Sequence, residues 1–371
     1  MQPNPPRTVR YMPDRASQAA EHERATHLHI ARRVADIMRW SFGGEWVESA
    51  SHPPGQTYFV PYQTISCDIA STCGIGSVDD LFGGVVPHAH VGTKVVTHGL
   101  VSPRSAAPAG WCEAFSTAVD GAVLEGFSVF DPSDLERAAK ALLAQGSMRV
   151  KRPDGVGGQG QQVVEDAAQF AALVDGLSEE RLAQEGLVLE QNLSEVATLS
   201  VGQLRVGGLG ISYYGHQSGT LDNRGEPVYG GSELWCVRGG FDALDKLAPD
   251  ANTRLAIRQA MTYHEAALRC FPGILLSRAN YDVAQGRDAQ GQWRSGVLEQ
   301  SWRLGGASPA EIEAAAVLLR QPQRRTVHAV TVERYGRDAT APPGAIVLYH
   351  GEDPRNGPML KYAQVIHDAA A

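Results

Sequence analysis

The chain has 371 residues, of which 43% are hydrophobic and 20% are charged, the composition of an ordinary globular protein. This length predicts two or three lobes of about 100–200 residues each. The formal net charge of −8 disfavours electrostatic attraction to nucleic acid, although a small anionic ligand needs only local basic groups.

Two further features of the sequence bear on where the protein works. No apolar run approaches the ~18–20 residues of a membrane helix, and the start of the chain has no apolar core of signal-peptide length. The five cysteines include no CxxC pair, which favours reduced thiols over a disulfide framework. We therefore expect a cytoplasmic protein without a membrane partner.

Residues 1–92 are predicted to form a small N-terminal α/β lobe. The first ~15 residues are rich in proline and arginine, and we expect them to be poorly ordered. Apolar residues at helical spacing predict a helix over 16–40, and two apolar runs predict strands at 57–62 and 83–88.

Residues 93–191 form the second predicted lobe, in which helix and strand signals alternate. Asp131 or Ser133 can cap a helix that ends at Gly146, because short polar side chains begin helices and glycine ends them. The other predicted elements of this lobe are a strand at 147–153, a glycine-rich loop, a helix at 164–177 and a strand at 186–191.

Residues 192–371 form the third predicted lobe, which begins with strand-like runs separated by turns. A last helix is predicted to start at Ser308, with Glu311 three residues later completing a capping box. Beyond Gln321 the pattern predicts only one strand, at 345–350. The remaining predicted elements are strands at 198–206, 210–215, 226–237, 278–285 and 295–302 and a helix at 252–270.

The strongest local signal is the glycine-rich segment RVKRPDGVGGQGQQVV, residues 149–164. Glycine lets backbone N–H groups approach an anion closely, so the loop suits a cover over phosphates, with Lys151 as a cation beside it. The spacing fits neither the P-loop nor the dinucleotide-binding pattern, and the alternative is a flexible hairpin without a ligand. The glycines of this segment are Gly155, Gly157, Gly158 and Gly160.

The segment VLEQSWRLGG, residues 297–306, ends an apolar run with Glu299, Ser301 and Arg303. Residues at i, i+2 and i+4 of a strand share one face, so these three polar groups are predicted to lie together. The preceding predicted strand carries Asp282 and is joined to this one by a hairpin. The pattern predicts a polar site at the end of the two strands.

The order of these features resembles the ATP-grasp superfamily, in which two α+β lobes hold a nucleotide between them. The resemblance covers about residues 91–310 and implies an α+β ATP-grasp fold preceded by a small α/β domain. It also implies ATP as a cofactor, with Lys94 and Lys151 as the two nucleotide lysines and Gly155–Gly160 as the mobile loop over the phosphates.

The segment GLVLEQNL resembles the hinge between the two lobes of the superfamily. The resemblance implies that Glu190, Gln191 and Leu193 border the adenine, mainly through backbone groups. Glu195 would contact the ribose hydroxyls, and the alternatives are that Thr198 on the following strand does so or that Glu195 is a plain surface residue.

The resemblance also implies one or two Mg²⁺ ions between the ATP phosphates and the strand pair. Asp282 and Glu299 would be metal ligands, because carboxylate oxygens suit Mg²⁺. Ser301 stands where the superfamily usually has asparagine, so its shorter hydroxyl would hold the metal through water, or Asn280 would supply the missing amide. Arg303 would orient the reacting carboxylate, and Arg278 would be a phosphate arginine.

The function implied by the resemblance is an ATP-dependent ligase that activates a carboxylate as an acyl phosphate for attack by an amine or similar nucleophile. Lys151, Arg278 and Arg303 would be its catalytic residues, and its partners would be small molecules, with a homodimer by analogy. Two alternatives use the same residues. One is a kinase or other phosphotransferase, and the other is a nucleotide-binding protein with little or no turnover, which the serine at 301 keeps open.

Overall fold

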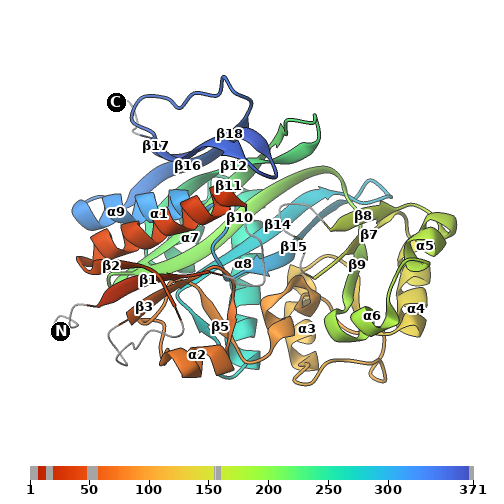
Figure 1. The fold of residues 1–371 in the computed structure, drawn as a ribbon. Helices are drawn as coiled ribbons and strands as arrows, with labels where there is room; N and C mark the ends of the chain where they lie inside the picture. The colour runs from red at the N-terminus through yellow and green to blue at the C-terminus, as the bar shows by residue number, and fades with distance from the viewer. Residues whose placement is uncertain (1–6, 14–19, 48–56, 154, 156–159, 367–371) are drawn as a thin grey trace.

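The computed structural model of the chain describes residues 7–13, 20–47, 57–153, 155 and 160–366. Within these residues the strands form four sheets of three, eight, three and four strands, and helices pack on their faces (Figure 1). The prediction of a mixed α+β fold is confirmed.

The N-terminal sheet has β1 at its centre, with β2 and β3 parallel to it on either side. Val9 and Tyr11 of β1 are buried in the same apolar cluster as one face of helix α1. The prediction that the first ~15 residues are poorly ordered is therefore wrong for this strand. Residues 14–19, where α1 was expected to begin, lie outside the described residues. The bounds are β1 Thr8–Met12, α1 Glu21–Met38, β2 Ser41–Glu45 and β3 Thr57–Pro61.

A second small sheet connects the N-terminal lobe to the rest of the molecule. Strand β13, from far along the chain, pairs with β5, which also pairs with β4. Strand β5 is shorter than the predicted 83–88, because Pro87 has no N–H to continue a ladder. The bounds are β4 Ile65–Ser66, α2 Cys67–Cys73, β5 Gly84–Val86, η1 Ala89–Gly92, η2 Lys94–Val96, α3 Glu113–Val119, η3 Asp120–Ala122 and β13 Leu275–Leu276.

A four-stranded sheet in the order β6-β9-β7-β8, with helices α4 to α6, forms what we term the small lobe. Asp131 accepts the amide of Asp134 at 3.0 Å, so the predicted start of helix α4 is confirmed. Leu135 and Leu142 of α4 are buried with Leu189 of β9, which fixes the helix on the sheet. The bounds are β6 Gly126–Val129, α4 Pro132–Leu143, β7 Met148–Lys151, β8 Gln161–Val164, α5 Ala167–Val174, α6 Glu179–Glu185 and β9 Leu187–Gln191.

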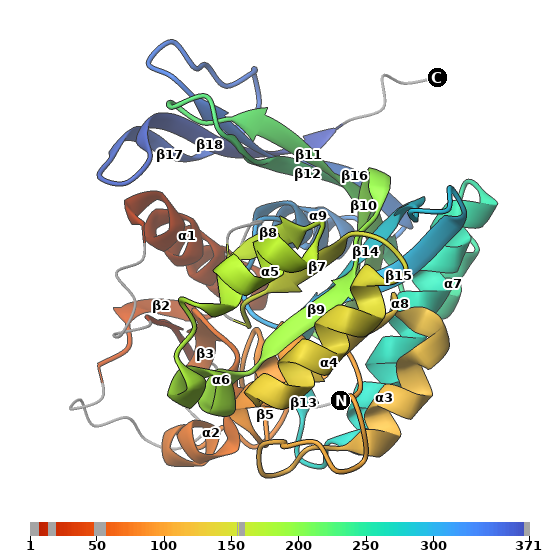
Figure 2. The ribbon, with the colours of Figure 1, turned by 90° about the vertical axis from the view of Figure 1, so that its right-hand side faces the viewer.

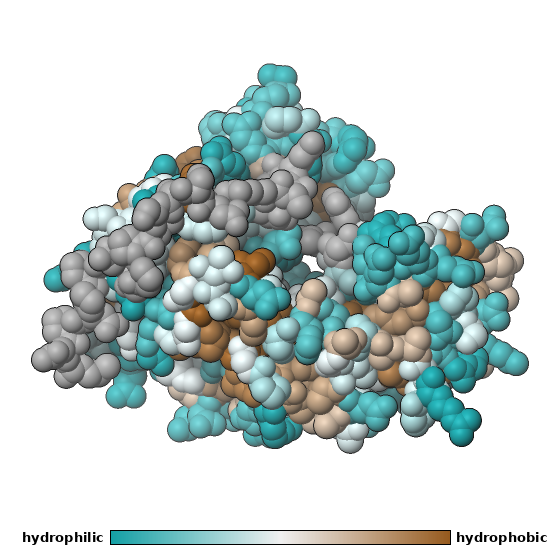
Figure 3. All heavy atoms as spheres, turned by 60° about the horizontal axis from the view of Figure 1, so that its bottom comes forward, coloured by the Kyte–Doolittle hydropathy of each residue, from teal (hydrophilic) through white to brown (hydrophobic). Residues whose placement is uncertain are grey.

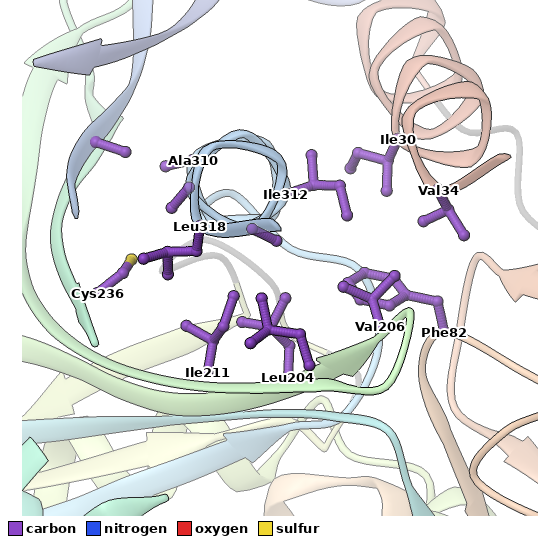
Figure 4. Packing of buried hydrophobic residues seen from close by; sticks show 14 of the residues in the cluster. Ile30, Val34, Phe82, Leu204, Val206, Ile211, Cys236, Ala310, Ile312 and Leu318 are labelled. Atoms are coloured by element: carbon purple, nitrogen blue, oxygen red, sulfur yellow. The ribbon is translucent and has the colours of Figure 1, made fainter. Parts of the chain in front are cut away.

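The largest sheet, termed the large sheet, has eight antiparallel strands in the order β15-β14-β10-β11-β12-β16-β18-β17. Because side chains alternate along a strand, Val201 of β10 packs with helix α8, whereas Leu204 packs with α9 and α1 (Figure 4). The sheet is thus covered on both faces. The bounds are β10 Ser194–Val206, β11 Leu209–Leu221, β12 Pro227–Arg238, α7 Phe241–Asp245, α8 Ala251–Cys270, β14 Arg278–Arg287, β15 Trp293–Ser301, α9 Ser308–Arg320, β16 Thr326–Tyr335, β17 Ile346–Asp353 and β18 Gly357–Ile366.

Helix α9 begins without the predicted capping box. Ala307 is its N-cap residue, and Ser308 is already helical, with its Oγ accepting the amide of Gly305 at 3.0 Å. Glu311 does not reach back to the cap, because its carboxylate is fully buried and binds Arg278. A tertiary ion pair with Arg278 has taken the place of the predicted local hydrogen bond to the helix cap.

Three strands after α9 extend the large sheet, where the sequence predicted only the strand at 345–350, confirmed as β17. The turn between β17 and β18 is built around Asp353, which is 1% exposed. Its carboxylate accepts the amides of Arg355 and Asn356 at 3.0 Å each, and that of His22 at 3.1 Å. The hairpin therefore caps the first turn of α1 from a distant part of the chain.

Candidate functional site

The two carboxylates predicted to lie together are directly opposite each other in the large sheet. Strands β14 and β15 pair with Asp282 beside Glu299 and Asn280 beside Ser301. Opposite residues of an antiparallel pair share a face, so all four polar side chains line one face of the sheet. The register shifts next to Asp282, and a bulge of this kind re-aims side chains at functional sites.

Asp282 is held by neutral donors rather than by a cation. Its Oδ1 accepts hydrogen bonds from Asn280 Nδ2 at 2.9 Å, Gln217 Nε2 at 2.8 Å and Ser200 Oγ at 3.2 Å. Burial raises the pKa of this carboxyl, and the nearby charge of Glu299 raises it further, while the three hydrogen bonds lower it. Asp282 and Glu299 therefore concentrate negative charge at a site that is partly buried from solvent.

Lys94, in the short helix η2, reaches this face of the large sheet. Its amine forms an ion pair with Glu299 and donates to the carbonyl of Gly155 at 2.9 Å. One cation thus joins a carboxylate of the large sheet to the glycine-rich loop of the small lobe. Figure 2 shows the small lobe in front of the large sheet, and Figure 3 shows a hollow between the small lobe, on the right, and the rest of the molecule.

Lys151, at the end of β7, forms a buried ion pair with Glu190 of β9. The second oxygen of Glu190 lies 3.1 Å from Nε2 of His98. Burial opposes ionisation of Glu190, but the charge of Lys151 and the contact with His98 outweigh it and hold the pKa of Glu190 at about 2. The carboxylate of Glu190 therefore pairs with Lys151 and is not exposed at the predicted hinge.

The other residues predicted to bind the nucleotide make only local contacts with neighbouring protein groups. The amide of Gln191 donates to the carbonyl of Glu125 at 2.8 Å. Leu193 is buried against Leu124, and Glu195 is exposed, with a φ of +52° and a 3.3 Å ion pair to Arg287. Gly160 closes the described part of the loop with its carbonyl accepting the amide of Arg152 at 2.8 Å, whereas Gly157 and Gly158 lie outside the described residues.

The two arginines predicted to be catalytic differ in their surroundings. Arg278 is 1% exposed and pairs bidentately with Glu311, at 2.6 and 2.9 Å, while Nη1 donates to the carbonyls of Ser301 and Arg303. Arg278 is thus engaged by protein groups, and its predicted role as a phosphate arginine stays a prediction. Arg303 is half-buried and donates to the carbonyl of Leu304 at 2.7 Å, and among the described residues no carboxylate pairs with it.

Sequence reasoning missed four residues that shape this site. The hydroxyl of Tyr213 lies 2.7 Å from Glu311 Oε1 and 2.9 Å from Asn280 Oδ1, and its one hydrogen is shared between these two acceptors. Gln217 and Ser200 donate to Asp282. His98, which supports Glu190, is the fourth. A hint was available for Gln217 and Ser200, because polar residues in apolar strands point to a polar partner. No comparable hint marks His98, which meets Glu190 only through the tertiary fold.

The donor set fits a divalent cation of the Mg²⁺ type only in part. Within the described residues, no group of three or more His, Cys, Asp or Glu side chains converges on one point. Asp282 and Glu299 offer two hard oxygen ligands with an unbalanced charge, which is what Mg²⁺ uses when phosphates and waters complete its octahedron. The site therefore fits a metal that arrives with a phosphate ligand.

Comparison with solved structures identifies the fold. The ADP complex of N5-carboxyaminoimidazole ribonucleotide synthetase is 12% identical, with a TM-score of 0.50 over 99% of this chain and 95% of that one. Biotin carboxylase from Campylobacter jejuni, in a β,γ-ATP complex, is 12% identical, with a TM-score of 0.54 over 98% and 88% of the two chains. A pyruvate carboxylase from Rhizobium etli is 13% identical, with a TM-score of 0.54 over 98% of this chain and 36% of that one.

These likenesses span nearly the whole chain and show an ATP-grasp fold. No curated protein sequence matches the chain. Among the helices in the described part, none is both long and apolar enough to cross a bilayer. A family model described as "Protein of unknown function (DUF3182)" matches residues 11–363, and the chain belongs to that family.

Proposed function

We propose that the chain is an ATP- and Mg²⁺-dependent ligase, which activates a carboxylate as an acyl phosphate for attack by an amine or a similar nucleophile. The observation that carries this proposal is the junction at Glu299, where the paired carboxylates of the large sheet, Lys94 and Gly155 of the loop come together. Two of the structures with a similar fold are described as an ADP complex and an ATP complex, which supports a nucleotide as the ligand.

The cation-binding side of the proposed site is the strand pair. Asp282 and Glu299 would hold Mg²⁺, which when bound supplies charge neutralisation for the phosphates. Ser301 lies beside them and would act through a water molecule because its side chain is short. Asn280 would replace the missing amide only with the second lone pair of its Oδ1, since its Nδ2 donates to Asp282 and its Oδ1 lies 2.9 Å from the hydroxyl of Tyr213.

The remaining residues would supply positive charge and orientation. Lys94 and Lys151 would stabilise the phosphates, and the backbone of the glycine-rich loop would cover them. Arg303 would orient the carboxylate substrate bidentately. A carboxylate oxygen would then attack the γ-phosphorus as ADP leaves, and the nucleophile would attack the acyl carbon as phosphate leaves. Positioning and electrostatics carry most of such a reaction.

Arg278 would act one step away from the substrate. Its guanidinium binds the backbone carbonyls of Ser301 and Arg303 and is itself fixed by Glu311. This arrangement holds the end of β15 in place. Arg278 would therefore fix the position of the Arg303 backbone rather than contact phosphate.

The test is ADP release from ATP and Mg²⁺ with a panel of amino acids and other small carboxylates, each tried with and without an amine. Turnover above a Lys151→Ala control with at least one carboxylate is the expected result. The absence of any such turnover would remove the support for a ligase.

The same experiment separates the two alternatives. A stable phosphorylated product that needs no second nucleophile would show a phosphotransferase. Tight binding of ATP that stays intact after long incubation would show a nucleotide-binding protein without turnover. The ligase is preferred because Arg303 is a cation beside the proposed phosphate site and no carboxylate of the described residues pairs with it, which suits a carboxylate substrate.

A further inference from the structure

A short segment of the chain, residues 94–98, contacts three separate parts of the fold. Lys94 pairs with Glu299 of the large sheet, and Thr97 shares a 3.1 Å hydrogen bond with the hydroxyl of Tyr263 in helix α8. His98 lies against β9 of the small lobe, 3.1 Å from Glu190. This segment therefore connects the metal-binding carboxylates to the lysine of the small lobe.

The contact at its end belongs to a buried cluster of three polar side chains. His98 and Glu190 are 2% and 1% exposed, and Lys151 is 3% exposed. Each oxygen of Glu190 has one partner, Lys151 on Oε1 and His98 on Oε2. A buried carboxylate with both oxygens occupied has one stable orientation, whereas a carboxylate with one free oxygen gains by turning toward another donor.

His98 is itself fixed by the fold rather than by Glu190. Its backbone carbonyl accepts the hydroxyl of Ser128 at 3.1 Å. Its ring lies against Gly126, where a Cβ would come within 2.9 Å of the imidazole, so only glycine leaves room for it there. The imidazole is therefore held in place as a hydrogen-bond donor to Glu190. The Glu190 carboxylate, fixed in this way, restricts the orientation of the flexible Lys151 side chain.

We propose that His98 is a positioning residue for the nucleotide: it fixes the Glu190 carboxylate, which in turn holds the amine of Lys151 in the orientation that binds phosphate. This inference rests on the proposed function, because it assumes that Lys151 meets a nucleotide. It assigns no contact between His98 and the ligand. The order of action is His98 on Glu190, Glu190 on Lys151, and Lys151 on the phosphates.

The experiment measures the dissociation constant of a non-hydrolysable ATP analogue with Mg²⁺ by calorimetry, on the full chain. His98→Phe keeps a ring of similar size but cannot donate, and we expect it to weaken binding by about tenfold, the size of one lost charge-assisted hydrogen bond. His98→Gln retains a donor and is expected to restore most of the affinity. If His98→Phe does not fold, His98→Asn takes its place, because its amide is too short to reach Glu190.

A double-mutant cycle distinguishes positioning from a general structural effect. If His98 acts through Lys151, the His98→Phe change has little further effect in a Lys151→Met background. A loss of affinity that is equal in both backgrounds would overturn the proposal, as would unchanged or tighter binding by His98→Phe.

The matched control is His264→Phe, in helix α8. His264 is also a histidine with a side-chain hydrogen bond, 2.8 Å from its Nδ1 to the hydroxyl of Tyr281, and its ring contacts among the described residues are with Phe241 and Tyr281 rather than with the small lobe. We expect its affinity for the analogue to equal that of the wild type, and an equal loss in this variant would also overturn the proposal. Failure of the wild type to bind the analogue would instead defeat the proposed function, so the two failures are distinguishable.

Discussion

Two pairs of charged residues lie directly opposite each other on neighbouring strands of the large sheet, and they combine their charges in opposite ways. Glu333 of β16 lies directly opposite Lys361 of β18, and the two form an ion pair at 2.7 Å with 7% and 4% exposure. Asp282 of β14 lies directly opposite Glu299 of β15, acid against acid. Opposite charges on facing strands stabilise a sheet, and like charges destabilise it.

We propose from this difference that the first pair stabilises the fold and that the second binds a ligand. The Glu333–Lys361 pair is neutral and complete in the protein as it stands. The Asp282–Glu299 pair is balanced only in part, by Lys94 and by neutral donors on Asp282. Such an imbalance is expected where a cation arrives with a ligand, and the predictions below test whether the two pairs differ in this way.

The largest effect is expected from Asp282→Asn. The change removes one proposed metal ligand, so ADP release with Mg²⁺ should fall by about 100-fold or more, as when a group that stabilises transition-state charge is lost. Removal of one of two facing negative charges should leave the free energy of unfolding unchanged or slightly higher. Activity assays and thermal unfolding check the two parts, and full turnover in this variant would place the metal elsewhere.

The reverse pattern is expected from Lys361→Met. This change leaves the buried carboxylate of Glu333 without its partner and should lower the free energy of unfolding by about 3 kcal/mol. The double variant Glu333→Gln/Lys361→Met should recover part of that loss, because no buried charge remains. Chemical denaturation measures both. Affinity for the ATP analogue should not change, and a selective loss of affinity without a loss of stability would make this pair part of the site.

The same two regions show how far the sequence alone can predict the structure. The hairpin of β14 and β15 was predictable because apolar runs, a polar turn and residues at alternate positions are local signals, and together they place Asp282 near Glu299. The C-terminal strands were mostly missed. β16 and β18 have mixed polar sequences, and they are strands because they pair with β12 and with each other, not because of their own pattern.

The partners of the site residues could not be predicted for a related reason. Arg278 looked like a phosphate ligand by position, but Glu311 reaches it from helix α9, and Glu311 had been assigned to a local cap. Lys151 was predicted to lie beside the phosphates. Its partner Glu190 lies on the same face of the sheet, on the neighbouring strand β9. Tertiary contacts of this kind decide which charged groups remain available to a ligand.

The pH dependence of stability should also distinguish Glu190, whose charge is balanced by Lys151, from Asp282, which faces another carboxylate. The pKa of Glu190 is lowered from 4.5 to about 2, so ionised Glu190 stabilises the fold above its ordinary pKa, and this contribution disappears as the pH falls through 4.5 toward 2. The pKa of Asp282 is raised, so its effect has the opposite sign: the fold gains from its protonation below the ordinary pKa and loses that gain as the pH rises.

Denaturation of the wild type, Glu190→Gln and Asp282→Asn at pH 7 and near pH 3 tests this sign. The advantage of the wild type over Glu190→Gln should shrink by about 1–2 kcal/mol at the lower pH. Relative to Asp282→Asn, the wild type should instead become more stable as the pH falls. Parallel curves for the two variants would mean that the two carboxyls have similar surroundings.

The smallest effect is expected from Ser301→Asn, which restores the residue usual in the superfamily resembled by this sequence. Ser301 lies beside Asn280, whose Nδ2 donates to Asp282 and whose Oδ1 lies 2.9 Å from the hydroxyl of Tyr213. An asparagine at 301 would add an amide oxygen that has neither of these partners. A longer side chain that reaches the metal directly should lower the Mg²⁺ concentration for half-maximal nucleotide binding by roughly threefold, less than one full ligand is worth. Titration of Mg²⁺ at fixed ATP analogue measures this, with Ser301→Ala as the control. Equal Mg²⁺ requirements in all three proteins would show that position 301 does not face the metal, and the site would then depend on Asp282 and Glu299 alone.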